Sequence, residues 1–243
     1  MIKTANAKPV YKDGKFIIQK EEEGTELKED IAAKKIGQAV KDGIPSISLD
    51  KENCYNNPEY TSKSDKLVSL TKEMNKKLKG SITYKFGKQV VVLDKNTYSS
   101  WLKIKKDYSG YKVDKNAMEN WLLKFMYKYN TQYGWHKFKT HDGRTKKIYG
   151  GPYGWRISKD KEMASVKKML KEGTTETREP YWREKAKVYD GVNGDIGDTY
   201  VEVDMGAQTV YYYKKGKVVL DTPFVSGRMT KDRFTPPGVY FLT

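Results

Sequence analysis

Apolar residues recur at helical spacing in several stretches of this chain. The stretches cover residues 27–40, 67–78, 118–129 and 158–173. Spacings of three to five residues place apolar side chains on one face of a helix, and that face must then be buried against a core. The third stretch carries Trp121 and Phe125 on its apolar face, so we expect this helix to be the core of its half of the molecule.

A second pattern predicts β-hairpins. The sequence Tyr-Lys-x-Gly-Lys, shortly before an apolar pair, starts at Tyr11, Tyr84 and Tyr213. Glycine adopts a positive φ at little steric cost, so each copy is predicted to be a turn that leads into a strand. Asp142-Gly143 predicts a further hairpin, while Pro180–Arg183 is interpreted as a break from regular structure. The copies are irregularly spaced, which argues against a solenoid.

Residues 200–243 predict an antiparallel β segment. Residues 201–205 alternate valine or methionine with acidic residues, a period of two that is typical of a strand with one face buried. Residues 208–213 are rich in aromatic and branched side chains, which also favour a strand. A segment this short rarely closes a hydrophobic core unaided.

The composition predicts a soluble globular chain. At 243 residues, with 37% hydrophobic and 13% aromatic residues, it is long enough for one large domain or two ordinary ones. No apolar run approaches the roughly 18 residues of a membrane helix, and no signal-peptide core follows the first residues. An export signal has therefore been removed or never existed.

The net charge of +16 lies in the first 190 residues, because residues 191–243 carry six basic and six acidic side chains. A basic surface raises the local concentration of anionic partners. We find no zinc-finger spacing, no aromatic RNA-binding motif and no helix-turn-helix pattern, so nucleic acid is not an expected partner. The remaining interpretations are binding of anionic cell-wall polymers, and lysines that serve only solubility.

Few residues suit nucleophilic or metal chemistry. The only cysteine, Cys54, lies in a loop-like stretch without a nearby histidine, and the two histidines are His136 and His141. None of them forms a His-x-Cys arrangement, and no second pair of ligands completes a zinc site. We therefore predict no catalytic residue within this chain, no bound metal and no cofactor.

Residues 200–243 resemble the first strands of the L,D-transpeptidase (YkuD-like) domain. The resemblance lies in Gln208, in Ser226-Gly227 and in Thr235-Pro236-Pro237-Gly238, in the order that the family uses. It implies a cysteine nucleophile in a Ser-His-Gly-Cys type of motif, later in the chain than Thr243. We therefore expect a catalytic domain truncated before its nucleophile, and an inactive chain. Candidate edges of the substrate cleft are Gly227, Arg228, Thr235 and Gly238.

A region upstream is similar to the peptidoglycan-binding domain found before L,D-transpeptidase domains in Gram-positive bacteria. The similarity lies in Tyr153-Gly154-Trp155, the acidic helix start near Glu162, Arg178–Tyr181 and Asp195–Tyr200. In a wall-binding role, aromatic side chains would stack on sugar rings while lysine and arginine hold wall carboxylates or phosphates. The alternative is that the aromatic residues fill the core of a small domain. The aromatic candidates are Tyr153, Trp155, Tyr181 and Trp182.

Together these patterns predict an α+β fold: an N-terminal mixed α/β module, or two, followed by the first strands of a mainly β catalytic domain. We expect a basic domain at residues 1–195 and an incomplete catalytic domain at residues 196–243. The basic domain could itself consist of two halves that meet near residue 94. Glycines at residues 191–197 mark the expected linker.

The resemblance implies a cell-wall L,D-transpeptidase that cross-links peptidoglycan stem peptides through a cysteine acyl-enzyme. Its partners would be stem peptides and anionic wall polymers, and it would work outside the cell or in the wall. Membrane contact would come only through an anchor absent from this chain. The alternative function is a stand-alone module that binds peptidoglycan or anionic wall polymer without transferase activity.

Overall fold

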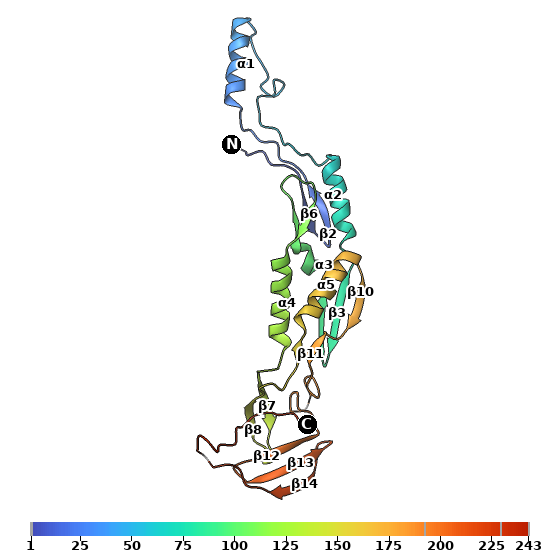
Figure 1. Cartoon of the computed structure of the whole chain (residues 1–243). Coiled ribbons are helices and arrows are strands. Elements are labelled where there is room, and N and C mark those ends of the chain that lie inside the picture. The colour runs from blue at the N-terminus through green and yellow to red at the C-terminus, as the bar shows by residue number, and fades with distance from the viewer. Residues whose placement is uncertain (1, 192, 229, 243) are drawn as a thin grey trace. The chain divides into compact units, whose positions relative to one another are not determined.

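The computed structural model describes residues 2–191, 193–228 and 230–242 (Figure 1). The backbone forms two compact units, each assembled from two stretches of sequence. Unit 1 contains residues 1–80 and 94–114, and unit 2 contains residues 81–93 and 115–243. No helix in the described parts of the chain is long and apolar enough to cross a membrane.

Unit 1 is built from short hairpins and helices. Its helices are α1 (Glu29–Lys41), α2 (Asp65–Lys76) and the short α3 (Lys95–Tyr98). Its strands are β1 (Lys8–Lys12), β2 (Lys15–Gln19), β5 (Leu102–Ile104) and β6 (Tyr111–Val113), paired as β1-β2 and β5-β6. Phe16 of β2 packs with Leu70, Met74 and Leu102 to form its core.

Unit 2 contains a three-stranded sheet in the order β10-β3-β4, built from β3 (Ser81–Phe86), β4 (Gln89–Leu93) and β10 (Thr175–Arg178). Strand β10 runs parallel to β3, and β4 antiparallel to it. Helices α4 (Lys115–Tyr129) and α5 (Lys159–Glu172) lie on the same face of this sheet, because Tyr84 of β3 contacts Phe125 of α4 and Glu162 of α5.

Aromatic rings fill the core between this sheet and its helices. The ring of Phe86 lies 4.8 Å from that of Tyr189, 5.2 Å from Tyr129 and 5.5 Å from Trp182, each nearly perpendicular to it. Edge-to-face contacts of this kind are favoured by the charge distribution of aromatic rings. The core of this part of unit 2 therefore depends on residues that are more than 100 positions apart in the chain.

The remaining strands of unit 2 form three small sheets. The hairpin of β7 (Trp135–Lys139) and β8 (Thr145–Tyr149) comes first, and β9 (Arg156–Ile157) pairs with β11 (Trp182–Glu184). The C-terminal sheet has the order β12-β13-β14, from β12 (Tyr200–Asp204), β13 (Thr209–Lys214) and β14 (Lys217–Pro223).

The structure confirms the predicted fold class and most predicted elements. The four apolar repeats are α1, α2, α4 and α5, and the three Tyr-Lys-x-Gly-Lys turns join β1 to β2, β3 to β4 and β13 to β14. The glycine of each turn adopts a positive φ, as expected: 78° at Gly14, 52° at Gly87 and 74° at Gly216.

One local expectation was wrong in part. Residues 180 and 181 lie outside helices and strands, but Trp182 begins β11 and pairs with Ile157. The alternation at residues 201–205 buries one face of β12, as expected, and the buried residue is Glu202 at 7% exposure, while Val201 and Val203 are 39% and 48% exposed. Alternation defines two faces of a strand and does not say which of them meets other elements.

The aromatic core predicts a large difference between two substitutions on paired strands. Phe86→Ala should lower the free energy of unfolding by about 3–5 kcal/mol, because it leaves a cavity among several rings. Val90→Ala should cost about 0.5 kcal/mol or less, because Val90 is 63% exposed on the sheet face away from the helices. Urea denaturation followed by tryptophan fluorescence measures both changes. Equal losses would contradict this assignment of the core.

Candidate functional site

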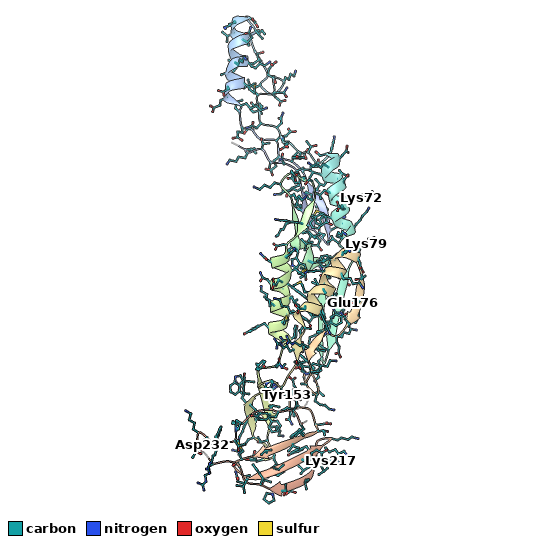
Figure 2. All side chains as sticks on the ribbon, viewed as in Figure 1. Lys72, Lys79, Tyr153, Glu176, Lys217 and Asp232 are labelled. Carbon is teal, nitrogen blue, oxygen red and sulfur yellow. The ribbon has the colours of Figure 1, made fainter. Side chains whose placement is uncertain are left out.

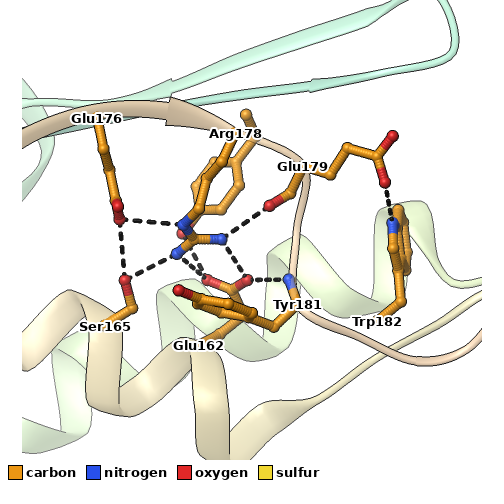
Figure 3. A network of polar contacts seen from close by, with 8 residues as sticks. Glu162, Ser165, Glu176, Arg178, Glu179, Tyr181 and Trp182 are labelled. Atoms are coloured by element: carbon orange, nitrogen blue, oxygen red, sulfur yellow. Dashed lines mark hydrogen bonds and ion pairs between the residues drawn. The ribbon is translucent and has the colours of Figure 1, made fainter.

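A buried ion pair joins α5 to β10. Glu162, in the first turn of α5, has 0% exposure, and its carboxylate faces the guanidinium of Arg178 at the end of β10 (Figure 3). Glu176 of the same strand is labelled in Figure 2. The Arg178 Nη1 atom lies 2.8 Å from Glu162 Oε1, and Nη2 lies 3.0 Å from Oε2. Two parallel charge-assisted hydrogen bonds of this kind fix the orientation of both groups.

The rest of the hydrogen-bonding capacity of this pair is also used. The Tyr84 hydroxyl donates to Glu162 Oε2 at 2.9 Å. The guanidinium donates further hydrogen bonds to the Ser165 hydroxyl, the Glu176 carboxylate and the Glu179 carbonyl oxygen (Figure 3). A buried charge is costly unless it is paired and fully hydrogen-bonded, and this network meets both conditions.

The electrostatics of the network follow from burial and from this pairing. Burial favours the neutral form of the Arg178 guanidinium, but the hydrogen bonds and charge of Glu162 outweigh it and raise the pKa of Arg178. Burial, and then the charge of Glu162, raises the pKa of Tyr84, so its hydroxyl stays protonated and continues to donate. The network therefore holds fixed charges and offers no group suited to proton transfer near neutral pH.

The network positions Tyr181, one of the aromatic candidates. The Tyr181 backbone N–H donates to Glu162 Oε1, and the Arg178 guanidinium carbon lies 4.1 Å from the centre of the Tyr181 ring. Tyr181 is 41% exposed, so part of its ring faces solvent above a buried positive charge. A flat ring held in this way can stack on a sugar or a peptide.

The other aromatic candidates are mostly packed inside unit 2. Tyr153 and Trp155 are buried with Ala186, and the half-buried Trp182 and Tyr189 pack against them. The Tyr153 hydroxyl donates to the Asp195 carbonyl oxygen at 2.9 Å, and Trp155 Nε1 donates to the Val188 carbonyl oxygen at 2.7 Å. Their polar atoms are thus satisfied within the protein, which supports the interpretation of Tyr153 and Trp155 as core residues.

The four candidates for cleft edges lie in the segment after β14. The Gly227 N–H donates to the Thr235 hydroxyl at 2.9 Å and closes a loop between them. A Cβ atom at Gly227 would lie 1.9 Å from the Arg233 carbonyl oxygen, so only glycine fits there. The side chain of Arg228 is exposed, and Gly238 is in contact with the Tyr240 ring.

Gln208 fixes the start of this segment. Its Nε2 donates to the Ser226 hydroxyl at 2.8 Å, and its Oε1 accepts from the Ser226 N–H at 2.9 Å. Further along, Val239 packs against the Tyr153 and Trp155 cluster, and the Phe241 ring lies 4.7 Å from that of Tyr153. The structure therefore brings the segment that holds Gly238 close to Tyr153 and Trp155, but it does not place Tyr181 in that contact.

A joint between the β7–β8 hairpin and the C-terminal sheet was not predicted from the sequence. The His141 ring stacks on Tyr211 with 3.8 Å between ring centroids, and its Nδ1 is 2.9 Å from the Tyr213 hydroxyl. The His141 backbone N–H donates to the buried Glu202 at 2.9 Å. Glu202 therefore faces inward because it has a polar partner there. This contact explains why β12 buries its acidic face rather than its valine face.

The cysteine and the two histidines considered for nucleophilic or metal chemistry lie at separate places in the structure. Cys54 is buried in unit 1 with 0% exposure. His136 is buried in unit 2, with Nδ1 3.7 Å from Asp195 Oδ2, while His141 lies at the hairpin joint. Within the described residues, no group of three His, Cys, Asp or Glu side chains is arranged to hold a metal ion.

One feature of the sequence indicated that Glu162 has a buried partner. Glu162 lies four and seven residues before Val166 and Met169, which places a carboxylate on the apolar face of α5. A charged residue at a buried position predicts a buried partner. Arg178 was not identified as that partner because strand β10, which brings it beside Tyr84, has no clear apolar alternation.

Comparison with known protein families identifies two regions of the chain. Residues 60–178 match the family described as "Putative peptidoglycan binding domain", and residues 198–243 match the L,D-transpeptidase catalytic domain, YkuD. The recognition of a YkuD-like L,D-transpeptidase with an upstream peptidoglycan-binding domain is therefore confirmed. Among curated proteins, no relative matches this sequence.

Two solved structures are similar to this chain. One is the crystal structure of the Enterococcus faecium L,D-transpeptidase C442S mutant, with 30% identity, a TM-score of 0.53, and coverage of 69% of this chain and 64% of that one. The other is the Ldtfm–avibactam carbamoyl enzyme, with 29% identity, a TM-score of 0.53, and coverage of 71% and 65%. The chain thus spans a little under two thirds of each of these proteins.

The buried ion pair predicts a large effect of a small substitution. Glu162→Gln should lower the free energy of unfolding by about 3–5 kcal/mol, because it removes the fully buried counter-charge of the Arg178 guanidinium. Among the described residues, Arg178 then keeps only the partly exposed Glu176 carboxylate as an acidic partner. The matched control on the same helix is Glu172→Gln, which removes an exposed pair with Lys168 and should cost about 1 kcal/mol or less. Chemical denaturation measures both.

The double variant Glu162→Met with Arg178→Met separates charge from packing. It should be less destabilised than Glu162→Gln, because no uncompensated charge is left in the interior. A double variant at least as unstable as the single one would show that the two side chains act through their shape or their other hydrogen bonds rather than through the ion pair.

Glu202 predicts a pH dependence of stability. Burial raises the pKa of Glu202 above its ordinary value of 4.5, although the His141 N–H partly opposes this. A carboxyl with a raised folded-state pKa contributes stability below its ordinary pKa, and this contribution declines as pH rises through the folded-state pKa. The stability of Glu202→Gln relative to the unmodified protein should therefore increase from about pH 4 to about pH 7. Asp221→Asn, at an exposed position of the same sheet, should leave the pH slope unchanged.

Proposed function

We propose that this chain provides the wall-binding region and the opening strands of the catalytic domain in an L,D-transpeptidase that cross-links peptidoglycan. The observation that carries the proposal is the order of the two family matches, a peptidoglycan-binding region at residues 60–178 followed by a catalytic-domain region at residues 198–243. The similarity to two solved structures, which covers 69% and 71% of this chain, supports it.

The proposed reaction is acyl transfer through a cysteine. A thiolate attacks the carbonyl carbon before the terminal D-alanine of one stem peptide, the C–N bond breaks, and D-alanine leaves with a proton on its amine. A side-chain amine of a neighbouring stem then attacks the thioester, which forms the new amide bond and regenerates the thiol. Neither step requires a metal or a nucleotide cofactor.

Within residues 1–243 no side chain fits the role of that nucleophile. Residues 198–243 contain no cysteine, and Cys54 is fully buried in unit 1, where a polymeric substrate cannot reach it. We infer that these residues bind and position the wall, and that Gly227, Arg228, Thr235 and Gly238 border the substrate cleft. The hydrogen bond from the Gly227 N–H to the Thr235 hydroxyl brings two of these candidates together, which supports this role.

The wall contacts are proposed to come from Tyr181 and from the basic surface. Tyr181 has the exposed ring that stacking on a sugar requires, whereas the burial of Tyr153 and Trp155 favours a supporting role for them. The net charge of +16 attracts the carboxylates and phosphates of wall polymers. The proposed site of action is the wall, outside the cell.

The alternative function is wall binding without transfer. The longer of the two family matches, residues 60–178, is to a binding domain, which favours this alternative. One experiment distinguishes the two functions, in which a cysteine-bearing L,D-transpeptidase domain is joined after residue 243. The fusion gains cross-linking activity only if this chain is a transferase region.

The proposed function predicts binding without turnover. The 243-residue chain should sediment with purified peptidoglycan sacculi in a saturable manner but release no D-alanine from stem tetrapeptides, because it lacks an accessible thiol. Tyr181→Ala should weaken sacculus binding by about 5-fold, which corresponds to about 1 kcal/mol for one lost stacking contact. Tyr127→Ala, which removes another exposed tyrosine at 92% exposure, is the matched control. Release of D-alanine, or failure to bind sacculi, would overturn the proposal.

A further inference from the structure

The β7–β8 hairpin of unit 2 carries two adjoining aromatic rings on its exposed face (Figure 1). Trp135 of β7 lies directly opposite Tyr149 of β8, and their ring centroids are 5.6 Å apart. Trp135 is 69% exposed and Tyr149 is 43% exposed. A single exposed ring needs no explanation, but two rings side by side form a patch on which a flat ligand can pack.

Two lysines continue the same face. Side chains alternate between the two faces of a strand, so residues two apart share a face. Lys137 therefore lies beside Trp135, and it is directly opposite Lys147 in the register of the hairpin. Like charges at directly opposite positions destabilise a sheet. This lysine pair costs stability in the free protein, and an anion bound between the two ammonium groups would relieve that cost.

Acidic side chains of the hairpin do not neutralise the lysine pair. Within the described residues, Lys137 and Lys147 form no ion pair. Asp142 is the only acidic residue between positions 135 and 149, and it pairs with Arg144 at the turn. The exposed face thus presents positive charge next to two aromatic rings.

The opposite face of the hairpin is packed inside unit 2. His136 and Phe138 are 6% and 5% exposed, and the Phe138 ring lies 5.4 Å from the ring of Tyr200. The Lys139 N–H also donates to Asn193 Oδ1 at 3.2 Å. A hairpin held through one face offers a preformed surface on the other, so a ligand binds without the cost of ordering a loop.

We propose that Trp135, Tyr149, Lys137 and Lys147, here called the hairpin platform, bind the glycan strand of peptidoglycan. A sugar ring stacks on the two aromatic rings, and a carboxylate of the strand or of its stem peptide lies between the two ammonium groups. The aromatic pair and the lysine pair are about 7 Å apart along the strands, so one ligand must combine a flat ring with a nearby negative charge.

Two observations favour this ligand over other partners. The hairpin lies within residues 60–178, the region that matches the peptidoglycan-binding family. Its exposed face has no aliphatic hydrocarbon side chain, because Lys139 and Thr145 complete it, whereas membrane insertion and protein docking draw on such side chains. Single-stranded nucleic acid also stacks on aromatic rings, and the test below includes it.

This inference deepens the proposed function, on which it rests, by naming a surface and the part of the wall that it holds. The test uses the full 243-residue chain and soluble glycan strands released from sacculi by an amidase, titrated by isothermal calorimetry. Trp135→Ala with Tyr149→Ala should weaken binding at least about 10-fold, because both stacking surfaces are lost. The control Tyr127→Ala removes a ring that is 92% exposed on α4 and should stay within about 2-fold.

A second matched pair tests the charges. Lys146 and Lys147 are neighbours in β8 and are both exposed, but they lie on opposite faces of the hairpin. Lys147→Gln should weaken strand binding about 5-fold at low salt, and Lys146→Gln less than about 2-fold. Equal losses would overturn the assignment, because net charge alone would then account for binding.

Thermal unfolding separates a loss of binding from a loss of fold. Lys147→Gln should leave the unfolding midpoint unchanged or higher, because its repulsion with Lys137 is removed. A lower midpoint would show that Lys147 has a stabilising partner in the protein, and would contradict its role as a charge reserved for a ligand.

Comparison with sacculi distinguishes failure of this inference from failure of the proposed function. If the chain binds sacculi, and the aromatic double variant binds strands and sacculi as tightly as the unmodified chain, the platform assignment fails and the proposed function stands. If the expected losses are seen with strands but the chain does not sediment with sacculi, the proposed function fails and the platform assignment survives. A loss confined to a single-stranded oligonucleotide, or to phosphatidylglycerol vesicles, would assign the platform to that partner and overturn the proposal.

Discussion

The ion pair between Glu162 and Arg178 is the constraint on which the central part of unit 2 depends. It joins the first turn of α5 to the end of β10, and its oxygen atoms also accept from Tyr84 of β3 and from the Tyr181 backbone. A carboxylate and a guanidinium taken out of water are tolerated only with complete pairing, so the surrounding segments can meet in few other ways. The exposed ring of Tyr181 is consequently fixed in place by charges that lie beneath it.

Local hydrogen bonds perform a similar role elsewhere in the molecule. Asn75 holds β2 against α2 by pairing with both backbone groups of Phe16, and Gln208 holds Ser226 by pairing with its N–H and hydroxyl. Between β2 and α2 these hydrogen bonds add to the apolar contacts of Phe16 with Leu70 and Met74. Directional contacts thus fix the register in which these segments meet.

The C-terminal sheet shows how a polar contact can decide the orientation of a strand. Val201 and Val203 are the more hydrophobic residues of β12, yet Glu202 is the buried one, because it accepts from the His141 backbone at the β7–β8 hairpin. Tyr211 and Tyr213 complete this joint through the His141 ring. Three aromatic or imidazole rings and one buried carboxylate thus connect the hairpin to the sheet that matches the catalytic domain.

The sequence by itself determined the helices, the glycine turns and the order of the two family regions, because helical periodicity, turn chemistry and short motifs depend on residues close together in the chain. It also contained the signal of Glu162 on an apolar helix face, but not its partner. Only the tertiary structure decided that Arg178 meets Glu162, that Tyr153 and Trp155 are buried while Tyr181 is exposed, and that β12 turns Glu202 inward. These outcomes depend on contacts between residues far apart in sequence, and the energy of burying a charge or a ring is set by what lies opposite it in the fold.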